Sequence, residues 1–283
     1  MSSPAPSTSL ERTYRYLRIG VAGTVVAIFV AVATAAASVG WLPSVSDYFY
    51  TPARNVLVGS LIAATLALVA LSGRGVQRWL LDAAALFAPL IALVPTTVVP
   101  GSVPGVGETC EATCFPPVAE PDAENGVVTY LVVGGVVVVV ALLLVALRQV
   151  AFRAVGASLA ITVSVLVAVG ATWTLAREAF LQHAHFAATI AFFALFAAVA
   201  MLSAFPRRGA PPAPVFRALY TAIAVGLVVV LVAYVVALPQ AAESGVPIVL
   251  VTEAAALTLF LMFWVVQGIE NWRDPDPSLL PLR

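Results

Sequence analysis

The stretch TYLVVGGVVVVVALLLVAL, residues 129–147, decides the fold class of this chain because it holds no charged side chain at all. A helix needs about 20 mainly apolar residues, at a rise of about 1.5 Å each, to cross the hydrocarbon core of a membrane. The stretch meets that length and has no residue that would oppose burial in lipid. It therefore predicts a transmembrane helix.

The composition of the whole chain agrees with this prediction. Of its 283 residues, 61% are hydrophobic and 10% are charged, whereas a soluble domain carries about 25% charged residues. The formal net charge is zero and every basic residue is an arginine, which gives no reason to expect a nucleic-acid partner. With only two histidines and two cysteines, we expect no metal site and no cofactor.

Eight stretches of the chain are long and apolar enough to span a membrane, so the sequence predicts an all-α membrane protein with eight transmembrane helices. They run near residues 19–40, 55–72, 78–98, 126–147, 154–175, 184–205, 216–238 and 247–268. We expect one transmembrane domain over residues 18–272, with disordered tails at 1–17 and 273–283. The first span is too long for a signal peptide and is interpreted as a retained helix.

The arginines predict the orientation of the spans, because short cytoplasmic loops retain positive charge. With eight spans, both termini and the loops 73–77, 148–153 and 206–215 share one side. All arginines except Arg54 and Arg177 border these segments. We therefore expect both termini in the cytoplasm of a bacterial cell, with the protein in its plasma membrane.

The longest connection, residues 99–125, would then face outward, and it contains both cysteines. Cys110 and Cys114 can form a disulfide if the segment between them turns helically, and an oxidising compartment favours this. A structural disulfide is the main interpretation, and a redox pair or a metal ligand set is the alternative. Two sulfurs do not complete a tetrahedral zinc site.

Several polar residues lie where the membrane disfavours them, mostly toward the same face. Arg54 opens the second span, His185 begins the sixth, and Glu253 lies about 9 Å below Pro247 in the eighth at helical rise. A buried carboxylate is stabilised by a cation, and Arg54 is one of two arginines on that side. We expect a ligand-binding polar pocket at the outer leaflet, with SDYFYTPARN as one wall and Glu253 and His185 as the others. Its candidate residues are Asp47, Tyr48, Tyr50, Arg54, Asn55, His185 and Glu253.

Simpler interpretations stay open for each of these residues. Trp41, Tyr48 and Tyr50 fit an interfacial aromatic belt, and Arg54 can extend to lipid headgroups. His185 can be a satisfied polar residue at a helix start, and Glu253 can serve only to join two helices. Elsewhere, Asp82 follows Arg78 by four residues, which predicts an ion pair within one helix.

Four segments resemble a family of bacterial integral membrane proteins that usually have six spans. The motifs are YFYTPARNVLVG (residues 48–59), IALVPT (91–96), HFAATIAFF (185–193) and EAAALTLFLMFWVVQG (253–268). The resemblance covers spans one to three and six to eight, and it leaves residues 126–176 as an inserted helical hairpin. It implies that Tyr50, Arg54, Asn55, His185 and Glu253 act together, and it implies no activity. A likeness to seven-span zinc hydrolases is weaker, because their site uses three histidines.

Three functions are compatible with the sequence. The first is a binding protein whose pocket holds a lipid headgroup or a small polar or anionic ligand, with Arg54 on the anionic group. The second is a small-molecule transporter, for which Pro89 supplies a helix break in mid-span. The third is a membrane-embedded enzyme that uses Glu253 or His185 as a general base on a lipid. No nucleophile motif supports the third, so we expect that the protein is not an enzyme.

Overall fold

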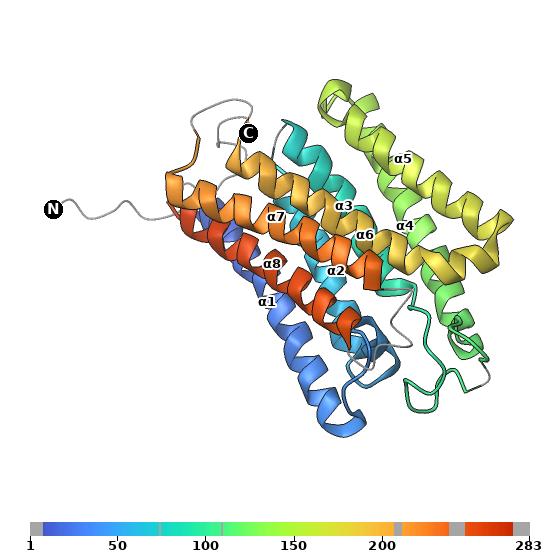
Figure 1. Cartoon of the computed structure of the whole chain (residues 1–283). Helices are drawn as coiled ribbons and strands as arrows, with labels where there is room; N and C mark the ends of the chain where they lie inside the picture. Colours follow the sequence, from blue (N-terminus) through green and yellow to red (C-terminus); the bar gives the residue numbers. More distant parts are fainter. Residues whose placement is uncertain (1–7, 74, 109, 207–210, 238–246, 274–283) are drawn as a thin grey trace.

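The computed structural model describes residues 8–73, 75–108, 110–206, 211–237 and 247–273, and it confirms the all-α fold class (Figure 1). No strand occurs among these residues, apart from isolated bridges in the loop after α3. Two 3-10 turns, η1 (Ser46–Tyr50) and η2 (Pro117–Ala119), accompany the α-helices. The helices are α1 (Ser9–Val39), α2 (Arg54–Ala70), α3 (Gly75–Leu93), α4 (Glu120–Ala146), α5 (Phe152–Leu175), α6 (Arg177–Ala204), α7 (Pro214–Ala237) and α8 (Ile248–Glu270).

Seven of the helices in the described chain are long and apolar enough to cross a membrane. The eighth, α2, has 17 residues, which is at the lower end of the range for a transmembrane helix. Large apolar side chains remain exposed along the helices, for example Val30, Val137 and Val229 at 57–60%. Such an exposed apolar surface is expected where the surroundings are lipid tails.

Six of the helices form a closed ring. Each contacts the next in the order α1, α2, α3, α6, α7 and α8, and α8 contacts α1 again. The largest buried cluster fills this six-helix ring, with Phe196, Phe260, Phe263 and Trp264 stacked edge to face and tilted against one another. Aromatic rings therefore set the spacing of α6 and α8 across the centre.

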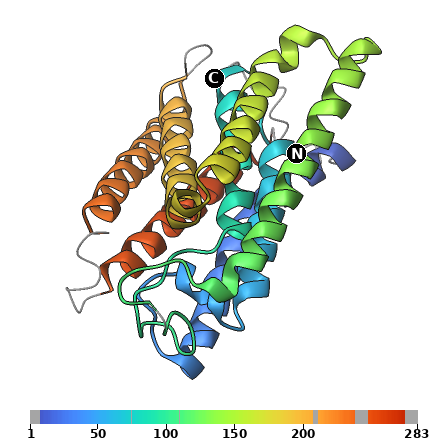
Figure 2. The same cartoon turned by 90° about the vertical axis from the view of Figure 1, so that its right-hand side faces the viewer.

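The helices α4 and α5 lie outside the six-helix ring, on the side away from α7 and α8 (Figures 1 and 2). They pack on each other and on α3 and α6. Most of their surface is exposed, and Val169 is the only buried residue of α5. This arrangement agrees with the lipid-facing hairpin expected at residues 126–176.

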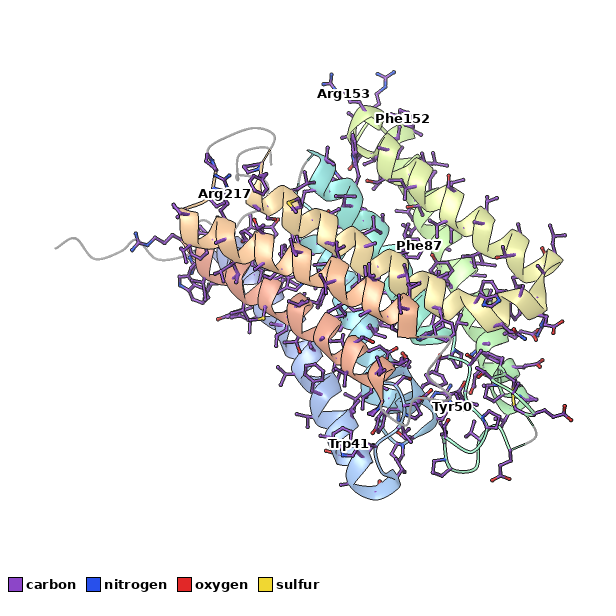
Figure 3. The ribbon with its side chains drawn as sticks, in the orientation of Figure 1. Trp41, Tyr50, Phe87, Phe152, Arg153 and Arg217 are labelled. Carbon is purple, nitrogen blue, oxygen red and sulfur yellow. A yellow bond between two sulfur atoms is a disulfide. The ribbon has the colours of Figure 1, made fainter. Side chains whose placement is uncertain are left out.

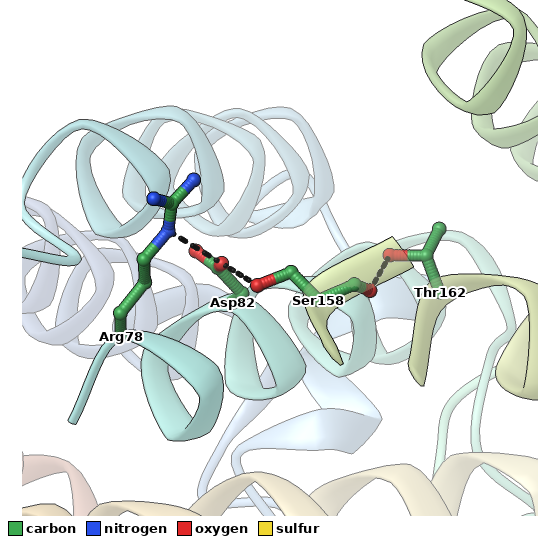
Figure 4. A network of polar contacts seen from close by, with 4 residues as sticks. All are labelled: Arg78, Asp82, Ser158 and Thr162. Carbon is green, nitrogen blue, oxygen red and sulfur yellow. Dashed lines mark hydrogen bonds and ion pairs between the residues drawn. The ribbon is translucent and has the colours of Figure 1, made fainter. Parts of the chain in front are cut away.

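Polar contacts attach this α4–α5 hairpin to α3 (Figure 4). The Ser158 hydroxyl of α5 donates to Asp82 at 2.6 Å, and Arg78 pairs with the same carboxylate at 3.5 Å. The expected Arg78–Asp82 pair is therefore confirmed, and it extends to a second helix. On α4, the Tyr130 hydroxyl donates to the Leu86 carbonyl at 3.1 Å.

Three helices, α1, α4 and α6, begin earlier than expected. Helix α6 starts at Arg177, ahead of the expected residue 184, so His185 lies in its third turn and not at its start. Helix α1 starts at Ser9, because Thr8 and Glu11 form a reciprocal capping box with bonds of 2.9 and 3.2 Å. Residues 9–17, expected in a disordered tail, are thus helical, while residues 1–7 and the end of the chain from 274 lie outside the described residues. Helix α4 starts at Glu120, inside the expected loop 99–125.

The remaining part of that loop carries the cysteine pair. Cys110 and Cys114 are bonded, with their Cα atoms 6.0 Å apart, within the range that a disulfide requires. The backbone of Cys114 also pairs with Val98, just after α3, through bonds of 2.9 and 3.1 Å. The disulfide therefore closes a small loop that is attached to the end of α3.

Candidate functional site

The segment between α1 and α2 folds against the start of α8. The Leu250 N–H donates to the Pro43 carbonyl at 2.8 Å. Ser44 and Asp47 then bond reciprocally, through Ser44 N–H to Asp47 Oδ2 at 3.1 Å and Asp47 N–H to Ser44 Oγ at 2.9 Å. These bonds cap the N-terminus of η1, whose first N–H groups have no partner within the helix.

Glu253 of α8 completes this cap from the other side. Its Oε2 accepts the N–H of Val45 at 2.6 Å and of Ser46 at 3.2 Å, and its Oε1 lies 3.1 Å from Ser46 Oγ. Glu253 is 6% exposed. A carboxyl group inside an apolar helix is thus matched by the free N–H groups of a neighbouring turn.

His185 of α6 reaches the same serine. Its Nε2 lies 2.9 Å from Ser46 Oγ, and its Nδ1 lies 2.8 Å from the Val94 carbonyl. Val94 follows the last residue of α3, where helix carbonyls lack partners, and the Tyr50 hydroxyl donates to the nearby Thr96 carbonyl at 2.6 Å. Ser46 therefore joins Glu253 and His185, and we call these three residues the Ser46 cluster.

A cavity of about 80 Å³ lies within the six-helix ring and ends at the Ser46 cluster. Its walls are apolar side chains of α1, α2, α3, α6 and α8, among them Ile28, Leu61 and Phe192. Ser46, His185 and Glu253 all line it. One water molecule needs about 10–15 Å³ by this measure, so the cavity has room for a few waters or a very small molecule.

Two buried hydroxyl groups in this region have no hydrogen-bond partner. Thr189 Oγ1 lies one helical turn after His185 and lines the cavity. Tyr234 of α7 is 3% exposed, and its hydroxyl interacts electrostatically with Glu253 and Asp47. Because buried polar groups are nearly always bonded to protein or water, the Thr189 hydroxyl is a free hydrogen-bonding group on the cavity wall.

Arg54 does not neutralise Glu253, and that part of the sequence prediction is wrong. Its guanidinium pairs with Asp122 of α4 at 2.9 Å and stacks over Phe49 at 4.3 Å. The pairing arises because α4 begins at Glu120 and presents Asp122 in its first turn. Both side chains are more than 40% exposed, so Arg54 belongs to the rim of the molecule.

The structure separates the other predicted site residues. Asp47 is buried beside the cluster, and Tyr48 is fully buried with its hydroxyl between Leu42 N–H and the Gly40 carbonyl, each at 3.2 Å. Asn55 is exposed and does not line the cavity. Among the aromatic-belt candidates, Trp41 is 70% exposed at the same end of the bundle as Tyr50 (Figure 3), whereas Tyr48 is a core residue.

Burial also changes the acidity of Asp47, which lies in the turn between two spans. Desolvation raises the pKa of Asp47 to about 7, against the two hydrogen bonds with Ser44, which lower it. The same group interacts electrostatically with Glu253. Two acids therefore lie within electrostatic range of each other, and within the described chain no arginine forms an ion pair with either of them.

Sequence reasoning found Glu253 and His185, included Ser46 only within the SDYFYTPARN wall and not among the candidate residues, and missed Thr189 and Tyr234. Hydroxyl residues are common in membrane helices and turns, so they carry little signal on their own. The available signal for Ser46 was its place directly before the Asp47–Tyr50 aromatic run. Thr189 could have been found from its spacing of four after His185, which places both on one helix face.

The Ser46 and His185 pair resembles an activated nucleophile, since the imidazole contacts the hydroxyl and is oriented by a carbonyl. However, Glu253 Oε1 contacts the same Oγ, and Oε2 occupies the adjacent N–H groups of Val45 and Ser46. In acyl transfer, free N–H groups beside the serine would have to bind the developing oxyanion. Here Glu253 already occupies them, so the site has no oxyanion hole at this position. The arrangement is thus better suited to binding a proton or a hydrogen-bonding ligand than to nucleophilic catalysis by Ser46.

Comparison of the chain with protein-family models, curated proteins and solved structures found no match.

Proposed function

We propose that this protein is a multi-pass protein of the bacterial plasma membrane that binds a small hydrogen-bonding molecule inside its six-helix ring. The observation that carries the proposal is the largely apolar cavity that is lined by the Ser46 cluster and by the unpartnered hydroxyl of Thr189. An apolar pocket with a few convergent polar groups is the usual form of a ligand site.

The size and charge of the cavity narrow the ligand. Pockets for drug-sized ligands measure about 300–1,000 Å³, whereas this cavity measures about 80 Å³. Its lining includes Glu253 and His185 but no arginine. These properties favour a small neutral or cationic molecule over the anionic lipid headgroup that Arg54 had suggested.

The orientation proposed from the arginines fits this site. Arg153 and Arg217 lie toward one end of the bundle, and Trp41 and Tyr50 lie toward the other (Figure 3). With the arginine end in the cytoplasm, the Ser46 cluster lies in the outer half of the membrane. The ligand would then come from outside the cell or from the outer leaflet.

A matched pair of threonine variants tests the proposal. Thr189→Leu fills the cavity, while Thr258→Leu makes the same change at an exposed position of α8. Small molecules released by denaturing each purified protein are identified by mass spectrometry. Thermal unfolding is also measured with a panel of short-chain amines, alcohols and amides.

We expect the wild type and Thr258→Leu to release or bind the same compound, and Thr189→Leu to lose it while remaining folded. Equal binding by both variants would contradict the site. A wild-type protein that releases nothing and is stabilised by no compound of the panel would contradict the function.

Transport of the same ligand is a second candidate, and Pro89 favours it. Pro89 lies inside α3, where it cannot donate to the Ala85 carbonyl. It lies two residues before Ile91, which with Ala92 lines the cavity. Transporters place interrupted helices at their binding sites. Flux of the identified compound into proteoliposomes, abolished by Thr189→Leu, would support transport, and binding without flux would exclude it.

A further inference from the structure

The hydrogen bonds of the Ser46 cluster require a definite number of protons. A carbonyl oxygen can only accept, so the contact with Val94 places a hydrogen on Nδ1 of His185. In neutral histidine the other nitrogen, Nε2, then carries a lone pair. That nitrogen can accept a hydrogen bond from Ser46 but cannot donate one.

Ser46 Oγ makes two contacts, to His185 Nε2 at 2.9 Å and to Glu253 Oε1 at 3.1 Å. Each contact needs one hydrogen, and the serine hydroxyl supplies only one. With an ionised Glu253 and a neutral His185, one of the two contacts would bring lone pairs together without a hydrogen. Both bonds exist together only if the cluster holds one further proton, on Oε1 or on Nε2.

The surroundings favour a proton on Glu253. His185 and Glu253 are 4% and 6% exposed, and separating charges in such a place is costly. The other ionisable groups that interact with Glu253 are Asp47 of η1 and Tyr234 of α7, and neither is a cation. With Oε1 protonated, Oε2 is the carbonyl oxygen that accepts the N–H groups of Val45 and Ser46.

We propose that Glu253, Ser46 and His185 form a proton-binding site that holds one shared proton, with Glu253 Oε1 as its resting place. The bonds then run in one direction, from Glu253 O–H to Ser46 Oγ, from Ser46 O–H to His185 Nε2, and from Nδ1–H to Val94. Proton transfer breaks the Oε1–H and Oγ–H bonds and forms new Oγ–H and Nε2–H bonds. The products are a carboxylate and an imidazolium, with no atom gained or lost.

This proton site goes beyond the proposed ligand binding and does not depend on it, since the three residues hold the proton by themselves. Because the proton site lines the cavity, a bound ligand can contact it directly. A cationic ligand that reached Glu253 would replace the proton, so ligand uptake would release a proton. Binding and proton release would then be coupled in the same pocket.

Infrared and NMR spectroscopy of the purified protein test the proposal without any ligand. At about neutral pH we expect an infrared band of protonated Glu253 that shifts in D₂O and disappears in Glu253→Gln, beside a separate band of the partly protonated Asp47. The Glu253 band should persist in Asp47→Asn, which removes the other buried acid. Ser46→Ala should shift the band, because Oε1–H loses its acceptor.

Nitrogen-15 NMR of the two labelled histidines reports the protonation state of His185, at the other end of this chain of hydrogen bonds. The His183→Gln variant, at an exposed position, assigns the signal of His185. We expect a neutral imidazole with hydrogen on Nδ1. An imidazolium with an ionised Glu253 would retain the shared proton but would overturn Glu253 Oε1 as its resting place.

A neutral His185 together with a Glu253 that gives no carboxylic acid band would overturn the proposal. Because Glu253→Gln can weaken folding, each variant is first checked by size-exclusion chromatography. If Glu253→Gln aggregates, the Ser46→Ala comparison decides, since an unchanged acid band in a folded Ser46→Ala protein also overturns the proposal. Failure of the ligand tests above leaves these spectra unaffected, so the two proposals fail separately.

Discussion

Glu253 shows how a carboxyl group is accommodated inside a transmembrane helix. An ionised side chain at the bilayer centre costs about 2.5–3.5 kcal/mol on insertion scales, and the protonated form proposed for Glu253 avoids this cost. In this protein the group meets two backbone N–H donors and a hydroxyl, and each net hydrogen bond is worth about 0.5–1.5 kcal/mol. The turn at η1 therefore stabilises Glu253, and Glu253 in return caps the turn.

Asp47 makes the stability of the protein depend on pH. Its pKa is raised from 3.8 to about 7, so the folded state binds this proton more tightly than the unfolded state. The stability that it contributes is complete below about pH 4 and is lost as the pH rises through about 7. We expect the wild type to unfold at a higher temperature at about pH 5 than at about pH 8, and Asp47→Asn to reduce this difference.

Thermal unfolding in detergent at both pH values measures the effect. The exposed loop acid Glu111 supplies the control, and Glu111→Gln should leave the pH difference as in the wild type. An undiminished difference in Asp47→Asn would show that another group causes it.

The single residues also show how far the sequence could predict the site. Glu253 and His185 were visible because ionisable groups are rare in apolar segments. The sequence did not reveal Asp122 as the partner of Arg54. Arg54 was paired with Glu253 because only two arginines were expected on that side, and Asp122 was expected in a loop and not in the first turn of α4. The central role of Ser46, which the sequence placed only within the SDYFYTPARN wall, was missed because it depends on three elements that meet only in the folded chain.

At the scale of helices, a glycine sets the distance between α4 and α3. A Cβ atom on Gly126 would lie 2.7 Å from the backbone oxygen of Leu93, which is too close for any atom at that position. Gly126→Ala must therefore move α4 away from α3, and we expect a loss of roughly 1–3 kcal/mol. Gly135→Ala in the same helix meets nothing within 4 Å and should be neutral or stabilising. Chemical or thermal unfolding of both variants checks this, and equal stabilities would contradict the close packing.

The hairpin has a second attachment in the bond from Ser158 to Asp82. Ser158→Ala removes a hydrogen bond to a carboxylate, and we expect a loss of about 1–2 kcal/mol. Ser164→Ala on an exposed part of α5 is the matched control. Limited proteolysis of the turn around residues 147–151 should become faster in Ser158→Ala only. Equal rates in both variants would mean that Ser158 does not hold the hairpin.

The sequence predicted which segments are helices, but it did not predict where α1, α4 and α6 begin. A long uncharged run such as residues 129–147 predicts a helix. The membrane core offers no water to the backbone N–H and C=O groups, so they must bond within the segment. The early start of α1 depended on the capping box of Thr8 and Glu11, which lies in a polar segment and was interpreted as a tail. The start of α4 lay in a region rich in acid and proline, where composition favours a loop.

For the whole molecule, the order of the helices in the ring could not be derived from the sequence. In lipid both faces of a helix are apolar, so the periodicity that separates core from surface in soluble proteins is weak. The low polarity of residues 126–176 did indicate a lipid-facing hairpin, and the structure places α4 and α5 outside the six-helix ring. The cavity is accordingly lined without any residue of α4 or α5.

The orientation of the whole molecule can be tested with its own cysteines, because both lie in the loop proposed to face outward. After mild reduction of intact cells, a membrane-impermeant maleimide should label Cys110 and Cys114 without permeabilisation. In a variant with both cysteines replaced by serine, Gln149→Cys places one thiol in the exposed turn between α4 and α5. Helix α4 has 27 residues and is about 40 Å long, so this thiol lies across the membrane from the disulfide loop. It should react only after permeabilisation, and the reverse labelling pattern would place the Ser46 cluster in the cytoplasmic half of the membrane.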